Sequence, residues 1–377
     1  MILTSEQQDI RHIAAEISEK ILAPQAAYYD ETEEFPWENI RQLSQAGFMG
    51  MLVPEIYGGS ELNTVASMVA LEEISKACAA TGAIVAVHNA AGILPILNFG
   101  TDEQRKKYLP KLARGEMIGA FALTEPGAGS DAAKVMTTAT NDGDEYILNG
   151  NKCFISNGGV AGTFVIFASK DKSKGVKGLS AFIVEKGTPG FSIGKHEKKM
   201  GIRASSTVEL VFDNCRIPKG NQLGKDGEGF KIAMATLDTA RIGIAAQAVG
   251  IAEAAYEMAK DYSKVREQFG KPICANQVIA FTLADMAIQI EAARQLTYHA
   301  AALKDSGQSY GKEAAMAKTF ASDRAVQIAL DAIQIMGGYG YSREYSAERL
   351  LRDAKITQIY EGTNQIQRLV ISRQILK

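Results

Sequence analysis

The sequence is poor in the residues that bind metals or form disulfides. It has only four cysteines and four histidines in 377 residues, and no two of the cysteines are closely spaced. A zinc site or a disulfide framework needs such spacing. We therefore expect reduced, packed thiols, no metal site, and histidines that are surface or packing residues. The cysteines are Cys78, Cys153, Cys215 and Cys274.

An excess of either charge is also absent. The formal net charge is −2 at pH 7, so no general attraction to nucleic acid or to an anionic membrane is expected. No window approaches the roughly 20 apolar residues of a membrane span. The first residues carry an early acid and no apolar core, which is typical of neither a signal peptide nor a transit peptide. A cytoplasmic location is the resulting expectation.

Hydrophobic periodicity divides the chain into three predicted domains. Residues 1–120 have helical spacing of apolar residues. Residues 121–228 have short β-rich runs with Gly and Asn-Gly turns and no helical pattern between them, which predicts an antiparallel barrel or sandwich. Residues 229–377 return to long helical patterns with short connections, which predicts a four-helix bundle completed by the final helix. The predicted class is α+β.

Two details of the first domain carry further expectations. Ser5 precedes the first helical pattern and is expected to cap it. Residues 84–99 are apolar on all sides, which is typical of a buried helix. Because Ala90, Ala91 and Gly92 are small, the same helix is also a candidate for the wall of a cavity.

One carboxylate near the end of the chain is a candidate general base. Glu361 lies between Tyr360 and Gly362, with no Lys or Arg within five residues on either side. Desolvation would raise its pKa toward the value that a general base needs. Gly362 permits a turn, or a close approach to a ligand, that other residues would strain. The alternative interpretation is a carboxylate at a helix start, with Gly362 and Thr363 supplying the turn.

Five motifs along the chain form a set that is more specific than any one of them. Taken singly, the two glycine-rich motifs indicate only a turn or a helix stop. In their order and spacing, the five motifs resemble those of the acyl-CoA dehydrogenases, over essentially the whole chain. The runs 201–207 and 237–245 resemble the short-chain, butyryl-CoA branch. The five motifs are Thr124–Asp131, Asn149–Gly158, Arg266–Pro272, Gln334–Gly340 and Tyr360–Thr363.

The resemblance implies helical, β and four-helix domains, with FAD bound between the last two, and usually a tetramer. It implies that Glu361 removes the α-proton of the substrate. Some relatives carry the base at the position of Ala240, and alanine cannot act there, which favours Glu361. The implied FAD contacts, partly to the cofactor of a neighbouring subunit, are Thr124, Ser130, Phe154, Ser156, Arg266, Phe269, Gln277, Gln334, Gly338, Thr363 and Gln365. The implied substrate contacts are Ser130, Asp238, Arg241, Tyr360 and Gly362.

Two of these positions depart from the pattern of many members. Phe154 and Ser156 stand where Trp and Thr are common. Phenylalanine still offers an aromatic face and serine still offers a hydroxyl, so we expect these changes only to tune the flavin.

The reaction implied by the resemblance is oxidation of a short acyl-CoA, with butyryl-CoA foremost, to the trans-2-enoyl-CoA, with electrons passed to an electron-transferring flavoprotein. An enoyl-CoA reductase would use the same residues, because one active site catalyses both directions. A branched short acyl group is a further alternative if the small residues of 84–99 leave room. An acyl-CoA oxidase is typically much longer. The acidic balance and the presence of Glu361 count against a nucleic-acid-binding flavoprotein relative.

Overall fold

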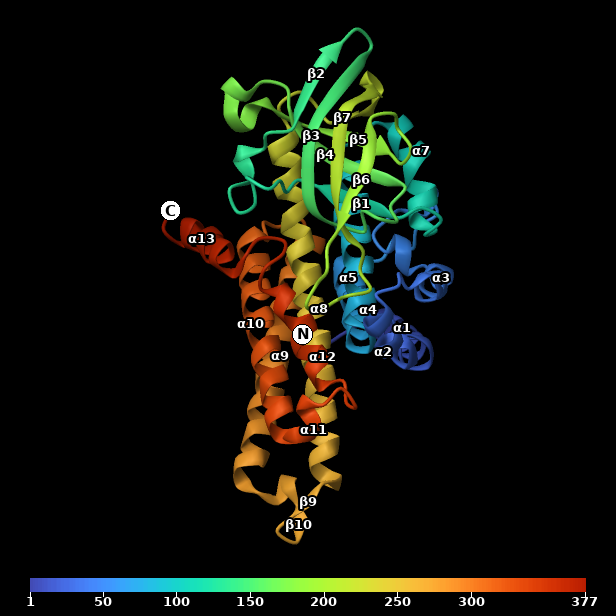
Figure 1. The fold of residues 1–377 in the computed structure, drawn as a ribbon. Coiled ribbons are helices and arrows are strands. Elements are labelled where there is room, and N and C mark those ends of the chain that lie inside the picture. The colour runs from blue at the N-terminus through green and yellow to red at the C-terminus, as the bar shows by residue number, and fades with distance from the viewer.

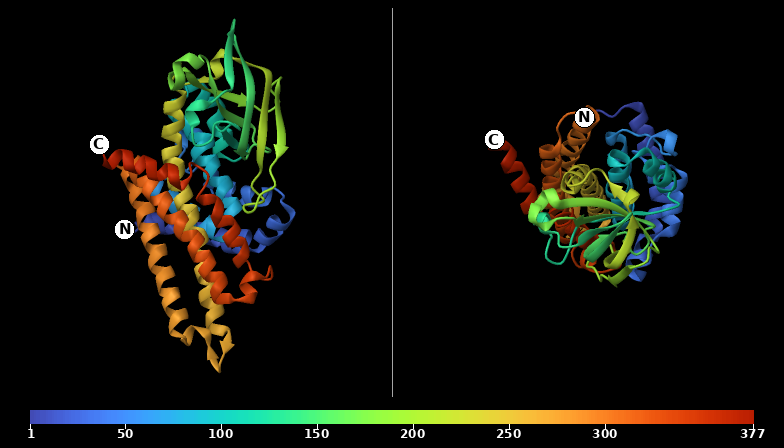
Figure 2. Two further views of the ribbon diagram at one scale, coloured as in Figure 1. Left: turned by 60° about the vertical axis from the view of Figure 1, so that its left-hand side comes forward. Right: turned by 90° about the horizontal axis from the view of Figure 1, so that it is seen from above.

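The computed structural model describes all 377 residues and has three parts (Figure 1). A β-domain lies at one end of the molecule and the tip of a long helical bundle lies at the other. The N-terminal helices lie beside the middle of the molecule (Figures 1 and 2). The expected α+β class, with helical, β and helical parts in this order, is confirmed.

Helices of the N-terminal part begin at side-chain caps. Thr4, and not the expected Ser5, caps the first helix: its hydroxyl accepts a hydrogen bond from the amide of Gln7 at 3.3 Å, and Gln7 Oε1 accepts one from the Thr4 amide at 3.1 Å. Thr4 has the extended backbone that a capping residue needs, whereas Ser5 is already helical. The helices are α1 (Ser5–Ile17), η1 (Ser18–Leu22), α2 (Ala23–Thr32), α3 (Trp37–Gln45), η2 (Phe48–Gly50), η3 (Glu55–Tyr57), α4 (Thr64–Ala77), α5 (Ala79–Ala86), η4 (Val87–Ile93), α6 (Leu94–Phe99) and α7 (Asp102–Ala113).

The apolar stretch of the first domain forms α5, the π-helical η4 and α6 in one run. This run, Ala79–Phe99, is long and apolar enough to cross a membrane by length and composition, which corrects the expectation that no such run exists. Its most apolar window is 94% buried inside the protein, as in a core helix of a soluble protein. Gly92 is small for a reason unrelated to a cavity, because a Cβ there would lie 2.8 Å from the Cα of Gly119.

The β-domain is one eight-stranded sheet with the order β6-β7-β3-β2-β4-β5-β8, and β1 pairs with β4. Most neighbours are antiparallel, as expected, but β1 and β2 both pair with β4 in the parallel direction. The pairing of β3 with β7 shifts between Lys152 and Ile155, so β3 bulges there. The elements are β1 (Gly119–Ala122), η5 (Ala132–Lys134), β2 (Thr138–Asp142), β3 (Glu145–Ser156), β4 (Thr163–Ser169), η6 (Lys172–Gly178), β5 (Leu179–Glu185), β6 (Phe191–His196), β7 (Thr207–Pro218), η7 (Lys219–Asn221) and β8 (Gln222–Leu223).

The C-terminal part is a bundle of α8, α9, α10 and α12. The final helix, α13, was expected to complete the bundle, but it packs on α10 and projects away from the other helices (Figure 2). Small residues let α8 approach α4 closely: a Cβ at Gly250 would lie 2.3 Å from the carbonyl oxygen of Glu72. The elements are α8 (Gly229–Val265), β9 (Glu267–Gln268), β10 (Lys271–Pro272), η8 (Ile273–Ala275), α9 (Gln277–Asp305), α10 (Gly311–Met336), α11 (Gly338–Tyr341), α12 (Ala347–Thr357) and α13 (Asn364–Ile375).

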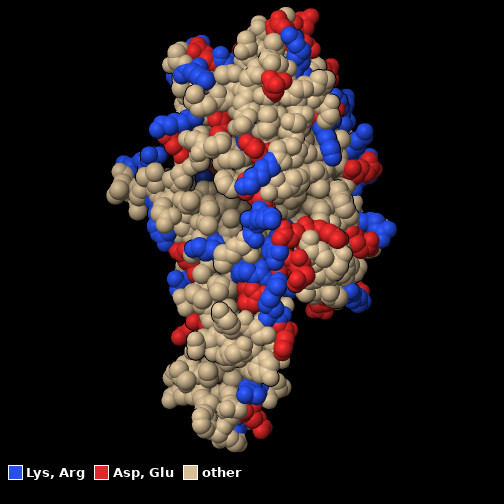
Figure 3. All heavy atoms as spheres, viewed as in Figure 1, with Lys and Arg blue, Asp and Glu red and all other residues tan.

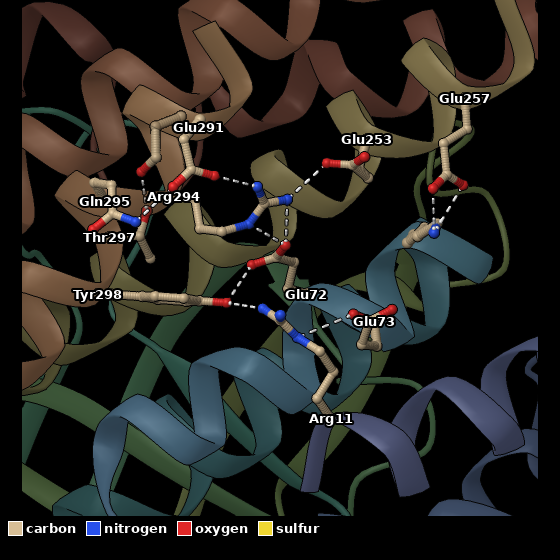
Figure 4. Close-up of polar contacts among 12 residues, drawn as sticks. Arg11, Glu72, Glu73, Glu253, Glu257, Glu291, Arg294, Gln295, Thr297 and Tyr298 are labelled. Carbon is tan, nitrogen blue, oxygen red and sulfur yellow. Dashed lines mark hydrogen bonds and ion pairs between the residues drawn. The ribbon is translucent and has the colours of Figure 1, made fainter. Parts of the chain in front are cut away.

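A network of charged side chains joins the N-terminal helices to the bundle (Figure 4). Arg294 on α9 donates hydrogen bonds of 2.7 Å to Glu72 on α4 and to Glu253 on α8. The hydroxyl of Tyr298 donates to Glu72 at 2.8 Å and accepts from Arg11 on α1 at 2.9 Å. The Glu72 side chain is only 5% exposed, and these partners compensate for the burial of its carboxylate.

We expect Arg294→Met to lower the free energy of unfolding by about 3 kcal/mol, because Glu72 would stay buried without its cation. Denaturant unfolding followed by circular dichroism measures the change. Lys20→Met is the control, since it removes only an exposed pair with Glu16 and should leave the midpoint unchanged. An unchanged unfolding midpoint for Arg294→Met would show that Arg294 does not stabilise the buried Glu72 carboxylate.

Candidate active site

Glu361 lies in a tight turn between α12 and α13. Both Glu361, with φ +55°, and Gly362, with φ +94°, are in the left-handed region. A non-glycine residue held there costs about 1–3 kcal/mol and persists only when its surroundings impose it. A Cβ at Gly362 would also lie 2.7 Å from Nε2 of Gln367. Helix α13 begins at Asn364 and is capped by Thr363, so Glu361 precedes the helix and is not its first-turn carboxylate.

Donors from the interior hold the two carbonyls of this turn. The Glu361 carbonyl accepts from Nε2 of Gln367 at 3.1 Å and from Nε of Arg241 at 3.4 Å. The Gly362 carbonyl accepts from the same Gln367 nitrogen at 2.9 Å and from Nζ of Lys318 at 2.9 Å. With the carbonyls fixed inward, the amide N–H of Glu361 has no acceptor within the protein and remains available to a ligand.

The electrostatic surroundings of Glu361 suit a proton acceptor. Burial raises the pKa of its carboxyl group above the ordinary value, and the charges of Arg241 and Lys318 oppose this rise only in part. Neither cation hydrogen-bonds the carboxylate, since both donate to backbone carbonyls of the turn. A partly buried carboxylate with a raised pKa and no salt-bridge partner is a candidate general base.

The five predicted substrate contacts lie in this turn, on α8 and on the β-domain. The Tyr360 hydroxyl donates to Oε1 of Gln247, which fixes the segment against α8. Asp238 and Arg241 form an ion pair of 2.6 Å on α8. Burial raises the pKa of Asp238, and Arg241 opposes the rise. The structure therefore brings together Glu361, Tyr360, Gly362, Asp238 and Arg241, whereas Ser130 lies on the β-domain.

The predicted cofactor residues of the β-domain surround the bulge in β3. Phe154 sits in the bulge with φ +56° and a side chain that is 65% exposed. The carbonyl of Thr124 accepts from the amide of Cys153 at 3.0 Å, so the loop that follows Thr124 lies beside the bulge. A Cβ at Gly127 or Gly129 would meet no atom within 4 Å. An exposed aromatic ring on strained backbone next to an open loop favours contact with a ligand. Ser130 is exposed and Ser156 is partly exposed at the end of β3.

A buried ion pair that sequence reasoning missed anchors this loop. Nζ of Lys152 lies 2.7 Å from the Glu125 carboxylate, which also accepts from the amides of Met136 at 2.6 Å and Thr137 at 2.9 Å. Burial lowers the pKa of Lys152 to about 8, against the opposing charge of Glu125. Burial alone would raise the pKa of Glu125, but Lys152 and the hydrogen bonds outweigh it, and the pKa is lowered. The available signal in the sequence was alternation along β3: Lys152 stands at a position where this alternation places Tyr146 and Leu148 in the interior.

Five other predicted cofactor residues belong to the segments around β9, β10 and α11, at the far tip of the bundle and away from the β-domain (Figure 1). Arg266 and Gly338 line an open hollow of about 550 Å³ there, together with Tyr262 and Tyr339. Phe269 is 97% exposed, with φ +53°, and Gln277 and Gln334 are exposed nearby. One chain therefore does not bring these residues to Thr124 and Phe154.

The two predicted contacts on α13 have different surroundings. The Thr363 hydroxyl accepts from the amide of Ile366 at 3.4 Å as the helix cap. Gln365 is exposed in the first turn of α13.

Lys318 and Gln367 contact the turn but were not singled out from the sequence. Lys318 is completely buried on α10, among buried alanines at positions 314, 317 and 321. A lysine within the small apolar stripe of a helix was the available signal, because such a charge needs a specific partner.

Comparison with known proteins gives one family for the whole chain. Models of the N-terminal, middle and C-terminal domains of the acyl-CoA dehydrogenases match residues 4–116, 120–215 and 227–376. A short-chain-specific acyl-CoA dehydrogenase of Clostridium acetobutylicum is 51% identical over 375 residues, covering 100% of this chain and 99% of the relative. An NADH-dependent acryloyl-CoA reductase of Anaerotignum propionicum is 50% identical, covering 100% and 95%.

Two solved structures have nearly the same fold. Butyryl-CoA dehydrogenase from Megasphaera elsdenii superposes with a TM-score of 0.98 at 49% identity and covers 100% of both chains. A chain in a structure described as the electron transferring flavoprotein of Acidaminococcus fermentans has a TM-score of 0.99 at 54% identity, covering 100% of this chain and 99% of that one.

Proposed function

Because the chain belongs to the acyl-CoA dehydrogenase family, whose members are FAD-dependent oxidoreductases, we propose that it oxidises butyryl-CoA to the trans-2-enoyl-CoA with Glu361 as the base. The relatives with short-chain specificity support activity on short acyl-CoA thioesters. The observation that carries the proposal is the Glu361 turn, where a carboxylate of raised pKa and a free backbone N–H belong to the same residue.

The residues on the β-domain fit FAD. Phe154 offers an exposed aromatic face, Ser130 and Ser156 offer hydroxyls, and the glycines at 127 and 129 leave the loop surface open to a ligand. We propose that these residues, with Thr124, hold the flavin end. When bound, FAD supplies the acceptor for the hydride that leaves the β-carbon of the substrate.

The protein's own contribution is to move a proton and to stabilise charge. The Glu361 carboxylate takes the proton from the α-carbon, and burial makes it basic enough to do so. Negative charge then develops on the thioester oxygen, and the free amide of Glu361 is a suitable donor for it. Arg241 donates to the Glu361 carbonyl and so helps to fix the turn that carries this amide.

We expect Glu361→Gln to lower the rate of flavin reduction by butyryl-CoA at least 10²–10⁴-fold while bound FAD is retained, because the amide keeps the shape but accepts no proton. Anaerobic stopped-flow absorbance measures the rate, and the visible spectrum measures FAD. Asp238→Asn is the matched control, since Asp238 is the other partly buried carboxylate beside Arg241. Loss of reduction only in Asp238→Asn would assign the base to Asp238.

A small apolar cluster that includes Ala240, the residue before Arg241 on α8, supports a short acyl chain. Ala240 on α8 packs with Ala90 and Leu94, and Leu52 and Leu97 contact the same cluster. Gly92 is filled by the backbone of β1 and leaves no side room of its own. Among the alternatives, a branched acyl group would need space beside Ala90 or Ala240, the two alanines of this cluster.

We expect the specificity constant to break sharply after C4 to C6. Each added methylene contributes about 0.8 kcal/mol, roughly fourfold in binding, only while the pocket has room, and overpacking costs about 1–3 kcal/mol. Specificity constants for C4, C6, C8, isobutyryl-CoA and 2-methylbutyryl-CoA with one electron acceptor test this. A maximum at C8 or longer would refute the short-chain proposal. A tenfold preference for a branched ester would favour a branched-chain enzyme.

The electron carrier and the direction of the reaction rest on similarity to known proteins, and not on the geometry of the site. We propose an electron-transferring flavoprotein as the acceptor, supported by the similarity to the chain from the Acidaminococcus fermentans structure. The 50% identity to an acryloyl-CoA reductase supports enoyl-CoA reduction as the second candidate. Acidic and basic side chains alternate over the visible face (Figure 3), which does not favour a nucleic-acid partner.

The division of the cofactor residues supports a homotetramer, built as a dimer of dimers, in which each bundle tip serves another copy. Arg266, Phe269 and Gly338 belong to the segments around β9, β10 and α11 at the tip of the bundle, whereas Phe154 belongs to β3 of the β-domain (Figure 1). The bundle tip shows few charges in Figure 3. Apolar side chains there are strongly exposed, including Val265 at 77% and Phe269 at 97%. Such a surface is typical of an interface, and a second copy would complete the cofactor site.

We expect Arg266→Ala to weaken both FAD retention and assembly, because its permanently charged fork suits a diphosphate. Light scattering and the FAD-to-protein absorbance ratio after gel filtration measure the two effects. Lys264→Ala is the control, because Lys264 is two residues before Arg266 and forms only an exposed pair with Asp261. A monomeric wild-type protein that holds FAD and is fully active would contradict the shared site.

A further inference from the structure

A fully buried lysine contacts the catalytic turn from the side opposite to solvent. Lys318 lies on α10 and has no exposed surface. Its ammonium group donates to the carbonyl of Gly362 at 2.9 Å and to Oδ1 of Asn364 at 2.8 Å. Burying a lysine is costly unless it is paired and hydrogen-bonded, and here both acceptors belong to the segment that carries Glu361.

The acceptors of Lys318 are themselves fixed. Nδ2 of Asn364 donates to Asp323 at 2.7 Å, and Nε2 of Gln358 donates to the same carboxylate at 2.8 Å. Asp323 follows Lys318 by five residues on α10, and it also pairs with Arg368 on α13 at 2.8 Å. Lys318 and Asp323 on α10 therefore hold the segment at three places. They contact Gln358 before the turn, Gly362 within it, and Asn364 and Arg368 after it.

We propose that Lys318 is a positioning residue for proton abstraction, which aims the Glu361 carboxylate by holding the Gly362 carbonyl and Asn364 in place. The inference rests on the proposed function, because it takes Glu361 as the base. The left-handed backbone of Glu361 is unfavourable by itself, so the turn needs such donors to persist. Three side chains donate to the carbonyls of the turn: Gln367, Arg241 and Lys318. Lys318 is the only one of the three that donates from an ammonium group.

Lys318 also acts on Glu361 through its charge. The charged groups around Lys318 are Glu361 in the turn, Arg241 on α8 with its partner Asp238, and Asp323 on α10 with its partner Arg368. Burial lowers the pKa of Lys318 to about 7, and the charge of Glu361 opposes this shift. In the other direction, the Lys318 cation lowers the pKa of Glu361. Removal of the cation should therefore raise the pKa of Glu361.

The test compares Lys318→Met with Arg294→Met. Both substitutions remove a cation from the helical interior, but Arg294 contacts only glutamates of the interdomain network and no part of the turn. Each variant is assayed for unfolding midpoint, FAD content and anaerobic flavin reduction by butyryl-CoA from pH 5.5 to 9. We expect Lys318→Met to reduce flavin about 10²-fold more slowly, as for a misplacement of about 1 Å. The fall of the rate at low pH should begin at a higher pH than in the wild type, because loss of the cation raises the pKa of Glu361. The concentration of butyryl-CoA at half-saturation should change little.

Arg294→Met should unfold more easily yet keep the wild-type rate and pH profile. A wild-type rate with a wild-type fall at low pH in Lys318→Met, or equal slowing in Arg294→Met, would overturn the proposal. If Lys318→Met does not fold, Asn364→Ala replaces it, because it removes one acceptor of the ammonium group and leaves the lysine. A wild-type rate in Asn364→Ala would then overturn the proposal.

Glu361→Gln separates this inference from the proposed function. If Glu361→Gln retains flavin reduction, the base assignment fails whatever Lys318→Met does. If Glu361→Gln is inactive and Lys318→Met behaves like the wild type, only the positioning role fails.

Discussion

The site depends on the hydrogen bonds that hold the carbonyls of Glu361 and Gly362 toward the interior. Two successive left-handed residues would not persist in solvent, and Gln367, Lys318 and Arg241 supply the donors that fix them. The same bonds leave the Glu361 amide without a protein acceptor and place its carboxylate where burial raises the pKa. One set of contacts thus prepares both the base and a donor for the developing negative charge.

Backbone strain occurs at three of the residues that the family resemblance associates with cofactor or catalysis. Phe154, Phe269 and Glu361 all have positive φ, although none is an Asn, Asp or Gly that tolerates the left-handed region readily. Phe154 and Phe269 are also strongly exposed. Strain of this kind concentrates at functional sites, where surrounding contacts or a ligand compensate for it. The bulge at Phe154 is supported by the neighbouring loop, which the buried Lys152–Glu125 pair anchors.

The class of fold could be predicted because periodicity changes twice along the chain, and Glu361 could be singled out because no local charge accompanies it. Features that depend on contacts distant in sequence could not. Lys318 is 43 positions before Glu361, and only the packing of α10 against the turn reveals their relation. The small size of Gly92 suggested a cavity for the substrate, but the backbone of Gly119 occupies that space. The departure of α13 from the bundle also has no local signal, since its helical pattern is the same wherever it packs.

The most direct test of the central claim is a crystal structure of the protein with FAD and an unreactive butyryl-CoA analogue. The measured quantity is the distance from the Glu361 carboxylate to the α-carbon of the acyl chain. The account predicts a separation of about 3–3.5 Å, the range of a productive approach, with the thioester oxygen at the Glu361 amide and the flavin on the other face of the chain. A structure in which Asp238 or another group approaches the α-carbon and Glu361 points away would contradict it.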